Sequence, residues 1–149
     1  MTRRSPRRRG ATVVEFAFVA PVFLVLVAGL IIGAIGVFRY QEVASLAREG
    51  ARWASVHGDR YQFATGNPAA TPADVYNNAI LPNAVGLDAS QLSYCVSWNA
   101  GNAPSQPGGD YEKATTNTVT VTVSYQWLPE LFLVGPVTLS SSSTVPMSY

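Results

Sequence analysis

The stretch FAFVAPVFLVLVAGLIIGAIGVF, residues Phe16–Phe38, decides the fold of this chain, because none of its 23 residues carries a charge. At ~1.5 Å per residue a helix of that length rises about 35 Å, more than the roughly 30 Å hydrocarbon core of a bilayer. Glu15 stands immediately before the stretch. A carboxylate there costs roughly 2.5–3.5 kcal/mol on membrane-insertion scales, so it needs a partner. The stretch predicts a transmembrane helix whose first acid requires a counter-charge.

A basic leader precedes the apolar stretch. Five of the ten basic residues stand before Gly10, and no acid does. Removing residues 1–10 leaves five basic and nine acidic side chains, a formal charge of −4. The leader is therefore predicted to hold the N-terminus in the cytoplasm, with the rest of the chain across the membrane. The alternative is an arginine tail that binds nucleic acid, but the acidic body and the adjoining apolar stretch argue against nucleic acid as a partner.

Other targeting signals fit the leader less well. A secretory signal peptide has an apolar core of about 7–15 residues, which is shorter than this one, and Ala34-Ile35-Gly36 is a weak cleavage site for it. The twin-arginine pattern does not follow either arginine pair of the leader. An uncleaved signal anchor stays open. Cleavage after Gly10, by contrast, would give Glu15 a counter-charge, the new α-amine of Ala11.

The apolar stretch is predicted to belong to one long helix over residues 11–57. Residues 11–38 would span the membrane, and residues 39–57 would continue as an amphipathic helix. Pro21 is expected to kink the helix or to loosen one hydrogen bond. Gly29 and Gly33 form a Gly-x-x-x-Gly pair, which allows a second helix to approach closely or reflects the ordinary composition of membrane helices.

The amphipathic half carries a stripe of small side chains. Its alanines follow a 3-4-3 spacing, at Ala44, Ala47, Ala51 and Ala54. A neighbouring lane holds Val43, Leu46, Gly50 and Trp53. Together they predict a broad face for close packing. The face is predicted to pack on this chain's own sheet, with a neighbouring subunit as the alternative partner.

Residues 58–149 are predicted to form a small α+β head. Residues 58–70 are expected to be a loop, and Thr71-Pro72-Ala73-Asp74 has the composition of a helix start. Alternating residues predict three strands, Leu92–Trp98, Thr118–Trp127 and Val137–Val145, with a long loop before the second. The predicted fold is therefore α+β, with a long N-terminal helix packed on a small antiparallel sheet of about three strands. The three tryptophans are expected to be core aromatics.

No group of residues predicts an enzyme. His57 is the only histidine, no Cys/His metal spacing occurs, and no phosphate-binding loop is present. We therefore expect no catalytic residue, metal, cofactor or small-molecule substrate; a calcium site joining Asp59 and Asp110 is a weaker alternative. Cys95 is predicted to be a small packed side chain, with an intermolecular disulfide or a reactive thiol left open. Leu131–Val134 is expected to be buried, or else to form an exposed patch.

Two motifs resemble a known family. Gly10, followed by Glu15 five residues later, resembles the prepilin-peptidase site of type IV pilins. The segment QEVASLAREGARWA, residues 41–54, is similar to the A-R-E-G-A-R-x-A segment of the TadE-like family, pilin-like proteins of the tight-adherence (Flp) pilus system. The tail from Val119 to Met147 also resembles that family's closing hairpin. The resemblance is loose between residues 58 and 115.

The resemblance implies a pilin-like fold and a role in a pilus. A prepilin peptidase would cut after Gly10, and Glu15 would pair with the amine of Ala11 in its own or a neighbouring chain. The chain would be a minor pilin or pseudopilin-like component, since major Flp pilins are much shorter. Its partners would be the peptidase, other pilin subunits, the assembly platform and membrane lipid. It would lie in the inner membrane with its head outside, able to enter a surface pilus. The alternative is an uncleaved, single-pass membrane-anchored extracytoplasmic binding module.

Overall fold

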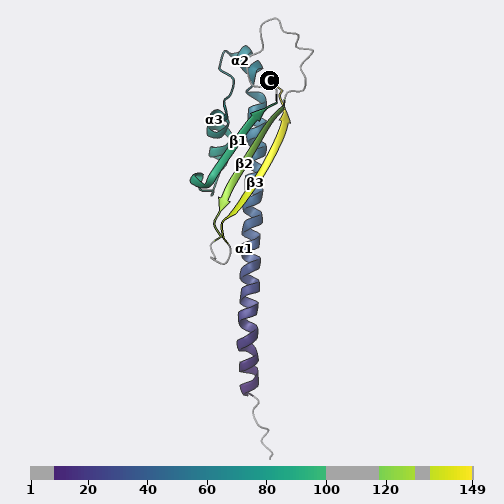
Figure 1. Cartoon of the computed structure of the whole chain (residues 1–149), viewed down its shortest axis with the longest axis vertical. Coiled ribbons are helices and arrows are strands. Elements are labelled where there is room, and N and C mark those ends of the chain that lie inside the picture. The colour runs from purple at the N-terminus through teal and green to yellow at the C-terminus, as the bar shows by residue number, and fades with distance from the viewer. Residues whose placement is uncertain (1–8, 100–117, 130–134, 149) are drawn as a thin grey trace, which may run out of the picture. The chain divides into compact units, whose positions relative to one another are not determined.

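The computed structural model of this chain describes residues 9–99, 118–129 and 135–148, with side chains from Thr12 onward. A helix of 48 residues, α1 (Arg9–Val56), is followed by short helices and a three-stranded antiparallel sheet (Figure 1). The α+β fold predicted from the sequence is confirmed. The chain divides into two compact units, Met1–Ile35 and Gly36–Tyr149, and we call the second unit the head.

The first unit consists, where it is described, of the first part of α1. This helix contains Pro21 and continues on both sides of it. A proline inside a helix removes one backbone hydrogen bond, which a helix of this length tolerates. The prediction of one helix through the apolar stretch is confirmed.

The sheet of the head has the strand order β1-β2-β3. Its strands are β1 (Leu92–Trp98), β2 (Thr118–Trp127) and β3 (Val137–Pro146). The first two match their predicted bounds, and β3 extends one residue further. In β2 the residues Val119, Val121, Val123 and Tyr125 are buried, whereas their neighbours face outward. The period-two alternation of the sequence therefore sets which face of the sheet is the core face.

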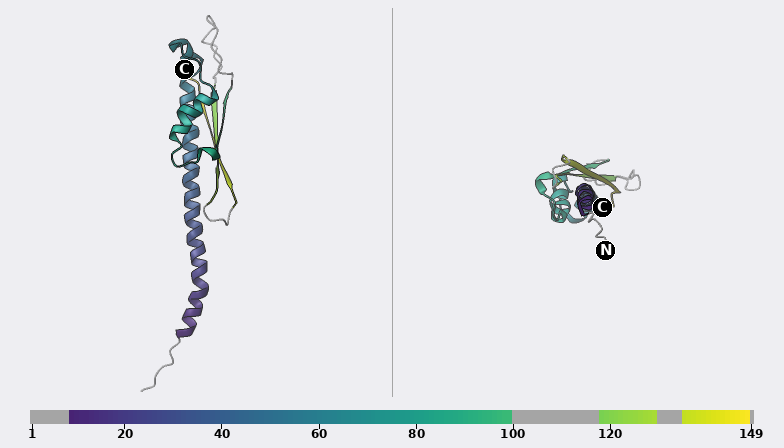
Figure 2. Two further views of the ribbon diagram at one scale, coloured as in Figure 1. Left: turned by 90° about the vertical axis from the view of Figure 1, so that its left-hand side faces the viewer. Right: turned by 90° about the horizontal axis from the view of Figure 1, so that it is seen from below.

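The second part of α1 covers that core face. Figure 2 shows the sheet along one side of the α1 ribbon and the α3 segment beside the same helix. The alanine stripe joins the strand valines in one hydrophobic cluster, so the amphipathic half packs on this chain's own sheet as expected. Trp53, Trp98 and Trp127 are partly buried against the cluster, in agreement with their prediction as core aromatics.

A short helix, α2 (Asp59–Thr65), occupies much of the predicted loop 58–70, so that prediction was wrong. Asp59 lies in its first turn, where a negative charge is favourable. Gly66 ends the helix with φ +75°, and its N–H donates to the carbonyl of Gln62. Only glycine adopts that conformation without strain, so Gly66 was the signal for this helix.

The predicted helix start at Thr71 is confirmed. Helix α3 (Pro72–Val75) begins with a capping box between Thr71 and Asp74, and Pro72 stands in its first turn. The chain continues as a π-helical turn, η1 (Tyr76–Ile80), and a 3-10 turn, η2 (Leu81–Asn83). A second 3-10 turn, η3 (Ala89–Gln91), leads into β1. The apolar side of this segment, which includes Val75 and Ile80, is fully buried.

The chain's C-terminal segment is tied to the end of α1. The backbone N–H of Ser148 donates to the carbonyl of Ser55 at 3.0 Å. The hydroxyl of Ser55, which is buried, donates to the carbonyl of Arg52 at 2.8 Å. The last carbonyls of a helix lack partners within the helix, and Ser148 supplies one of them.

Several predictions fall outside the described residues. They concern most of the leader, the loop that contains Asp110, and Leu131–Val134. They stay predictions.

Candidate functional site

The first part of α1 exposes apolar side chains. Fifteen large apolar residues between Val13 and Phe38 are exposed. By length and composition, the helix from Thr12 is a candidate membrane span, the single one among the described residues. So large an exposed apolar surface is not stable in water, so it fits lipid or the helices of other chains. This segment is the candidate assembly and anchoring site.

The residues predicted for processing lie at the start of this segment. The peptide bond between Gly10 and Ala11 falls in the first turn of α1. Glu15 is exposed, and its carboxylate forms no ion pair with another residue that the structure describes. Side chains of an α-helix lean toward its N-terminus, so Glu15 lies on the face of Ala11 one turn earlier. Its carboxylate is thus open to a partner on that side.

The Gly29–Gly33 pair lies on an open part of the helix. A Cβ atom built at either glycine meets no atom of the described chain within 4 Å. The described part of the chain therefore places nothing on these two positions. A helix of another chain can approach the bare backbone there closely.

The alanine stripe belongs to the interior of the head. Ala47, Ala51 and Ala54 are fully buried, and Ala44 is nearly so. Gly50 lies in the same face: a Cβ atom built there would be 3.1 Å from Val121 Cγ1 and 3.2 Å from Ile80 Cγ1. Gly50 is therefore a point of close approach of α1 to both β2 and η1. The signal in the sequence was a glycine in mid-helix, which costs about 1 kcal/mol unless packing requires it.

Two contacts fasten the rest of the head to α1 near the end of the apolar stretch. A Cβ atom built at Gly36 would be 2.8 Å from Cζ3 of Trp127, so the indole ring lies directly on the helix backbone. Arg39 Nη1 donates to the carboxylate of Glu42 at 3.2 Å and to the carbonyl of Gly86. Sequence reasoning missed both contacts, because they join segments far apart in the chain.

The outer face of the sheet is an uncharged layer of small side chains. Hydroxyl pairs join β2 to β3 at 2.8–2.9 Å, namely Thr120–Thr144, Thr122–Ser142 and Ser124–Ser140. Cys95 lies opposite Thr122 on β1 and is exposed. The prediction that Cys95 is packed was wrong: the alternation placed it on the small-residue face, and that face is the solvent side. A disulfide or a reactive thiol at Cys95 stays a prediction.

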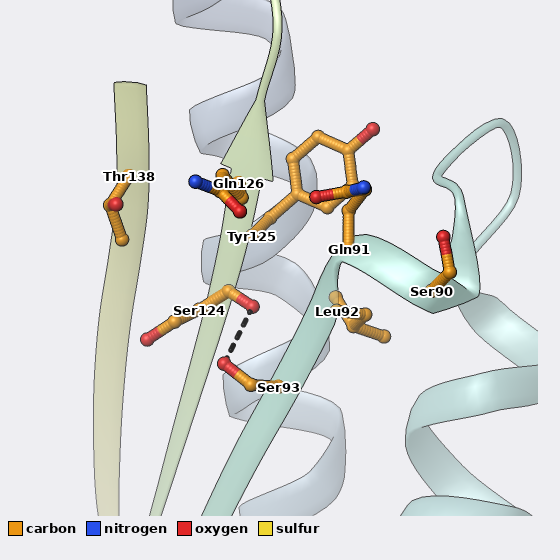
Figure 3. A pocket seen from close by; sticks show the side chains of 8 residues that line it. All are labelled: Ser90, Gln91, Leu92, Ser93, Ser124, Tyr125, Gln126 and Thr138. Atoms are coloured by element: carbon orange, nitrogen blue, oxygen red, sulfur yellow. Dashed lines mark hydrogen bonds between the residues drawn. The ribbon is translucent and has the colours of Figure 1, made fainter. Parts of the chain in front are cut away.

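An open groove of about 350 Å³ continues this layer toward one end of the sheet (Figure 3). Figure 3 labels Gln91 and Tyr125 among the residues that line the groove, and Ser93 Oγ donates to the carbonyl of Ser124 at 3.4 Å. The lining residues include no charged side chain and no nucleophile with a base beside it. The groove can hold water or a small neutral molecule by hydrogen bonds.

Two aspartates of the head, Asp74 and Asp88, have lowered pKa values, and both are capping groups. The hydroxyl of Thr71, followed by its backbone N–H, lowers the pKa of Asp74. The backbone N–H of Ser90, followed by its hydroxyl, lowers the pKa of Asp88. Hydrogen bonds to the ionised form cause both shifts. Among the described residues no three His, Cys, Asp or Glu side chains lie close enough to hold a metal ion.

His57 is held in a stack of aromatic rings. Its ring lies 3.9 Å from that of Trp53 and 4.7 Å from that of Tyr61. Its Nδ1 is 2.8 Å from the carbonyl of Trp53. Because only a protonated nitrogen can donate to a carbonyl, Nδ1 carries the proton in this arrangement. These contacts make His57 a structural residue at the end of α1.

The described residues thus form a long helix with an exposed apolar part and a small antiparallel sheet packed on the later part of that helix. Residues 10–52 match the family model of the TadE-like proteins. This segment contains Gly10, Glu15 and Ala47–Arg52, so the predicted resemblance is confirmed there. The match supports a Tad pilus-associated protein that interacts with other pilus components, and the apolar helix is consistent with membrane anchoring. Comparisons with curated proteins and with solved structures find no match.

Proposed function

We propose that this chain is a minor pilin or pseudopilin-like component of a tight-adherence pilus, processed by a prepilin peptidase after Gly10. One observation supports this proposal most directly. The apolar part of α1 is exposed, and its single acid, Glu15, stands five residues beyond Gly10. The core of the head is built on the later part of the same helix, and the exposed side chains of the apolar part would contact lipid and other subunits.

Processing would hydrolyse the peptide bond between Gly10 and Ala11. The leader would leave with the Gly10 carboxylate, and Ala11 would keep the new α-amine. The first turn of a helix has N–H groups without partners and opens easily, so the bond can enter an extended peptidase site. The left-handed glycines of the described chain are Gly66 and Gly86, so a side chain at Gly10 strains no left-handed backbone. Its role would be to fit a narrow subsite of the peptidase.

The new α-amine of Ala11 would then form an ion pair with the carboxylate of Glu15. Ala11 and Glu15 are four residues apart in α1, so they share a helix face, and the Glu15 side chain leans toward Ala11. The pair can form within one chain or between neighbours. Two opposite charges in a layer of low dielectric constant compensate one another's burial only when they are adjacent. A pairing between chains would fix the axial register of one helix against the next.

Cleavage is tested by intact-mass and N-terminal analysis of the chain from native membranes. The wild type should begin at Ala11. Gly10→Leu should keep the full leader, because leucine is a good helix former that fills the subsite. Gly29→Leu is the matched control, since it makes the same change in the same helix and should be cleaved normally. A wild-type chain that still carries Arg7-Arg8-Arg9 would refute processing and favour the uncleaved anchored binding module.

The pairing is tested by Glu15→Ala and Glu15→Gln. Both should insert and be cleaved as the wild type is, because neither touches the scissile bond. Both should strongly reduce recovery of the chain in crosslinked pilus complexes, with Glu15→Gln showing that the lost property is charge rather than size. Normal assembly of both variants would refute the pairing and leave the cleavage proposal standing.

A further inference from the structure

Two segments of the head contact α1 at the end of the apolar stretch. The last three residues of that stretch, Gly36, Val37 and Phe38, belong to the head unit, and the side chains of Val37 and Phe38 are exposed. Trp127, the final residue of β2, lies on the backbone of Gly36. The end of β2 is thus fixed at the level of the last apolar turn of α1.

A second segment is fastened at almost the same level. Arg39 donates to the carbonyl of Gly86, and Val85, which precedes Gly86, is 76% exposed. Leu128, which follows Trp127, is 59% exposed. Gly36 and Arg39 are three residues apart, so about 4.5 Å of helix separates the two attachment points. Two large apolar side chains from distant segments are therefore presented close to the end of the apolar stretch.

Arg39 carries little free charge at this level. It pairs with Glu42 at 3.2 Å, so the two side chains neutralise one another. Large apolar side chains that are exposed together mark a contact surface rather than a face turned to bulk water. Tryptophan, with an apolar body and one N–H donor, is enriched where a membrane meets water.

We propose that the base of the head, made of Val85, Trp127 and Leu128, is seated in the lipid headgroup layer of the membrane that α1 spans. The proposal rests on the membrane insertion contained in the proposed function. The apolar stretch is about 35 Å long against roughly 30 Å of hydrocarbon, so its last few residues extend into the interfacial layer. The side chains fastened to those residues lie at the same depth. The bilayer is the occupant we propose, because these segments are attached at Gly36 and Arg39, where the apolar stretch ends within the head unit.

The test uses the full chain in lipid vesicles. Cys95 is the only cysteine and is exposed among hydroxyls, so Cys95→Ser provides a cysteine-free background. Val85→Cys and Leu128→Cys are each labelled with a fluorescent dye. Phe63→Cys in α2, 70% exposed, is the control matched for size and exposure. Lipids that carry a nitroxide quencher at the headgroup report the dye's depth. The wavelength of maximum tryptophan emission, measured before labelling in vesicles without the quencher, reports that the head is folded. A protected apolar fragment after proteolysis reports insertion separately.

Several-fold stronger quenching at Val85 and Leu128 than at Phe63 is expected. Equal quenching at the three positions, in a chain that is inserted, would refute the lipid contact and leave the proposed function intact. A chain that does not insert would refute both. If one labelled variant fails to fold, the other decides, because the two positions belong to separate segments.

Discussion

The two parts of α1 use their apolar side chains in opposite ways. Between Val13 and Phe38 the large apolar side chains are exposed, whereas between Val43 and Ala54 the apolar face is buried against β2 and η1. The two parts of α1 differ in the size of their apolar side chains and in how these are arranged around the helix. The first part is apolar all round, and the second has a one-sided stripe of small residues that allows the backbone to approach a sheet. A helix that is apolar all round needs a surrounding apolar phase, and a striped helix needs one flat partner.

The largest difference between the two parts of α1 should appear when a core side chain is truncated and the free energy of unfolding is measured. Ile80→Ala removes a fully buried side chain, and the cavity should lower the free energy of unfolding by about 2–5 kcal/mol. All three tryptophans lie in the head, so denaturant unfolding followed by tryptophan fluorescence in detergent measures the head alone. Leu30→Ala, in the exposed part, should change that value by less than about 0.5 kcal/mol. A comparable loss in both variants would mean that the apolar part also stabilises the head.

The next largest difference in stability should appear when a glycine of each part of α1 is replaced by leucine. Gly50→Leu places a side chain where Val121 and Ile80 leave no room, so it should destabilise the head by about 1–3 kcal/mol. Gly29→Leu makes the same change where nothing lies within 4 Å, and the unfolding midpoint should stay the same. An unchanged midpoint for Gly50→Leu would show that α1 can move away from the sheet at little cost.

Removing the cap of α3 should have a smaller effect, confined to the head. Thr71→Ala removes the hydroxyl of the capping box, which should cost about 0.5–2 kcal/mol in the same unfolding experiment. Thr71→Ser keeps the hydroxyl and should retain most of the stability. Equal losses in the alanine and serine variants would assign the effect to the threonine methyl group instead.

The pH dependence of Asp74 should be the smallest effect. Its pKa is lowered in the folded head, so the aspartate adds stability above the ordinary carboxyl pKa of about 3.9 and loses it as the pH falls through the lowered value. The wild type should therefore exceed Asp74→Asn in stability near neutral pH, and the difference should shrink below about pH 4. Because Asp74 is exposed, the effect should be slight. A difference that is constant with pH would contradict the capping role.

The sequence predicted the elements whose pattern is local. Alternation in Thr118–Trp127 fixed both the bounds of β2 and its buried face, and the capping residues at Thr71 fixed the start of α3. Helix α2 was missed because it is short and buries no residue, so it has no apolar face to give a period. Cys95 was misplaced because alternation sorts residues into two faces without telling which one is covered.

The site could be predicted only in part. The spacing of Gly10 and Glu15 is visible in the sequence, and it is this segment that the family model matches. The contacts of Trp127 with Gly36 and of Arg39 with Gly86 join residues about fifty or more positions apart, so only the folded chain brings them together. The surface at the base of the head therefore could not be predicted from the sequence.

The hydrogen bond from Ser148 to Ser55 has a practical consequence for labelling this protein. Ser55 lies 17 residues beyond Phe38 along α1, so the C-terminal segment is held about 26 Å of helix rise away from the end of the apolar stretch. A reporter attached after Ser148 would start from the part of the head remote from the end of the apolar stretch. It could be attached, imaged or pulled without displacing Trp127 or Leu128.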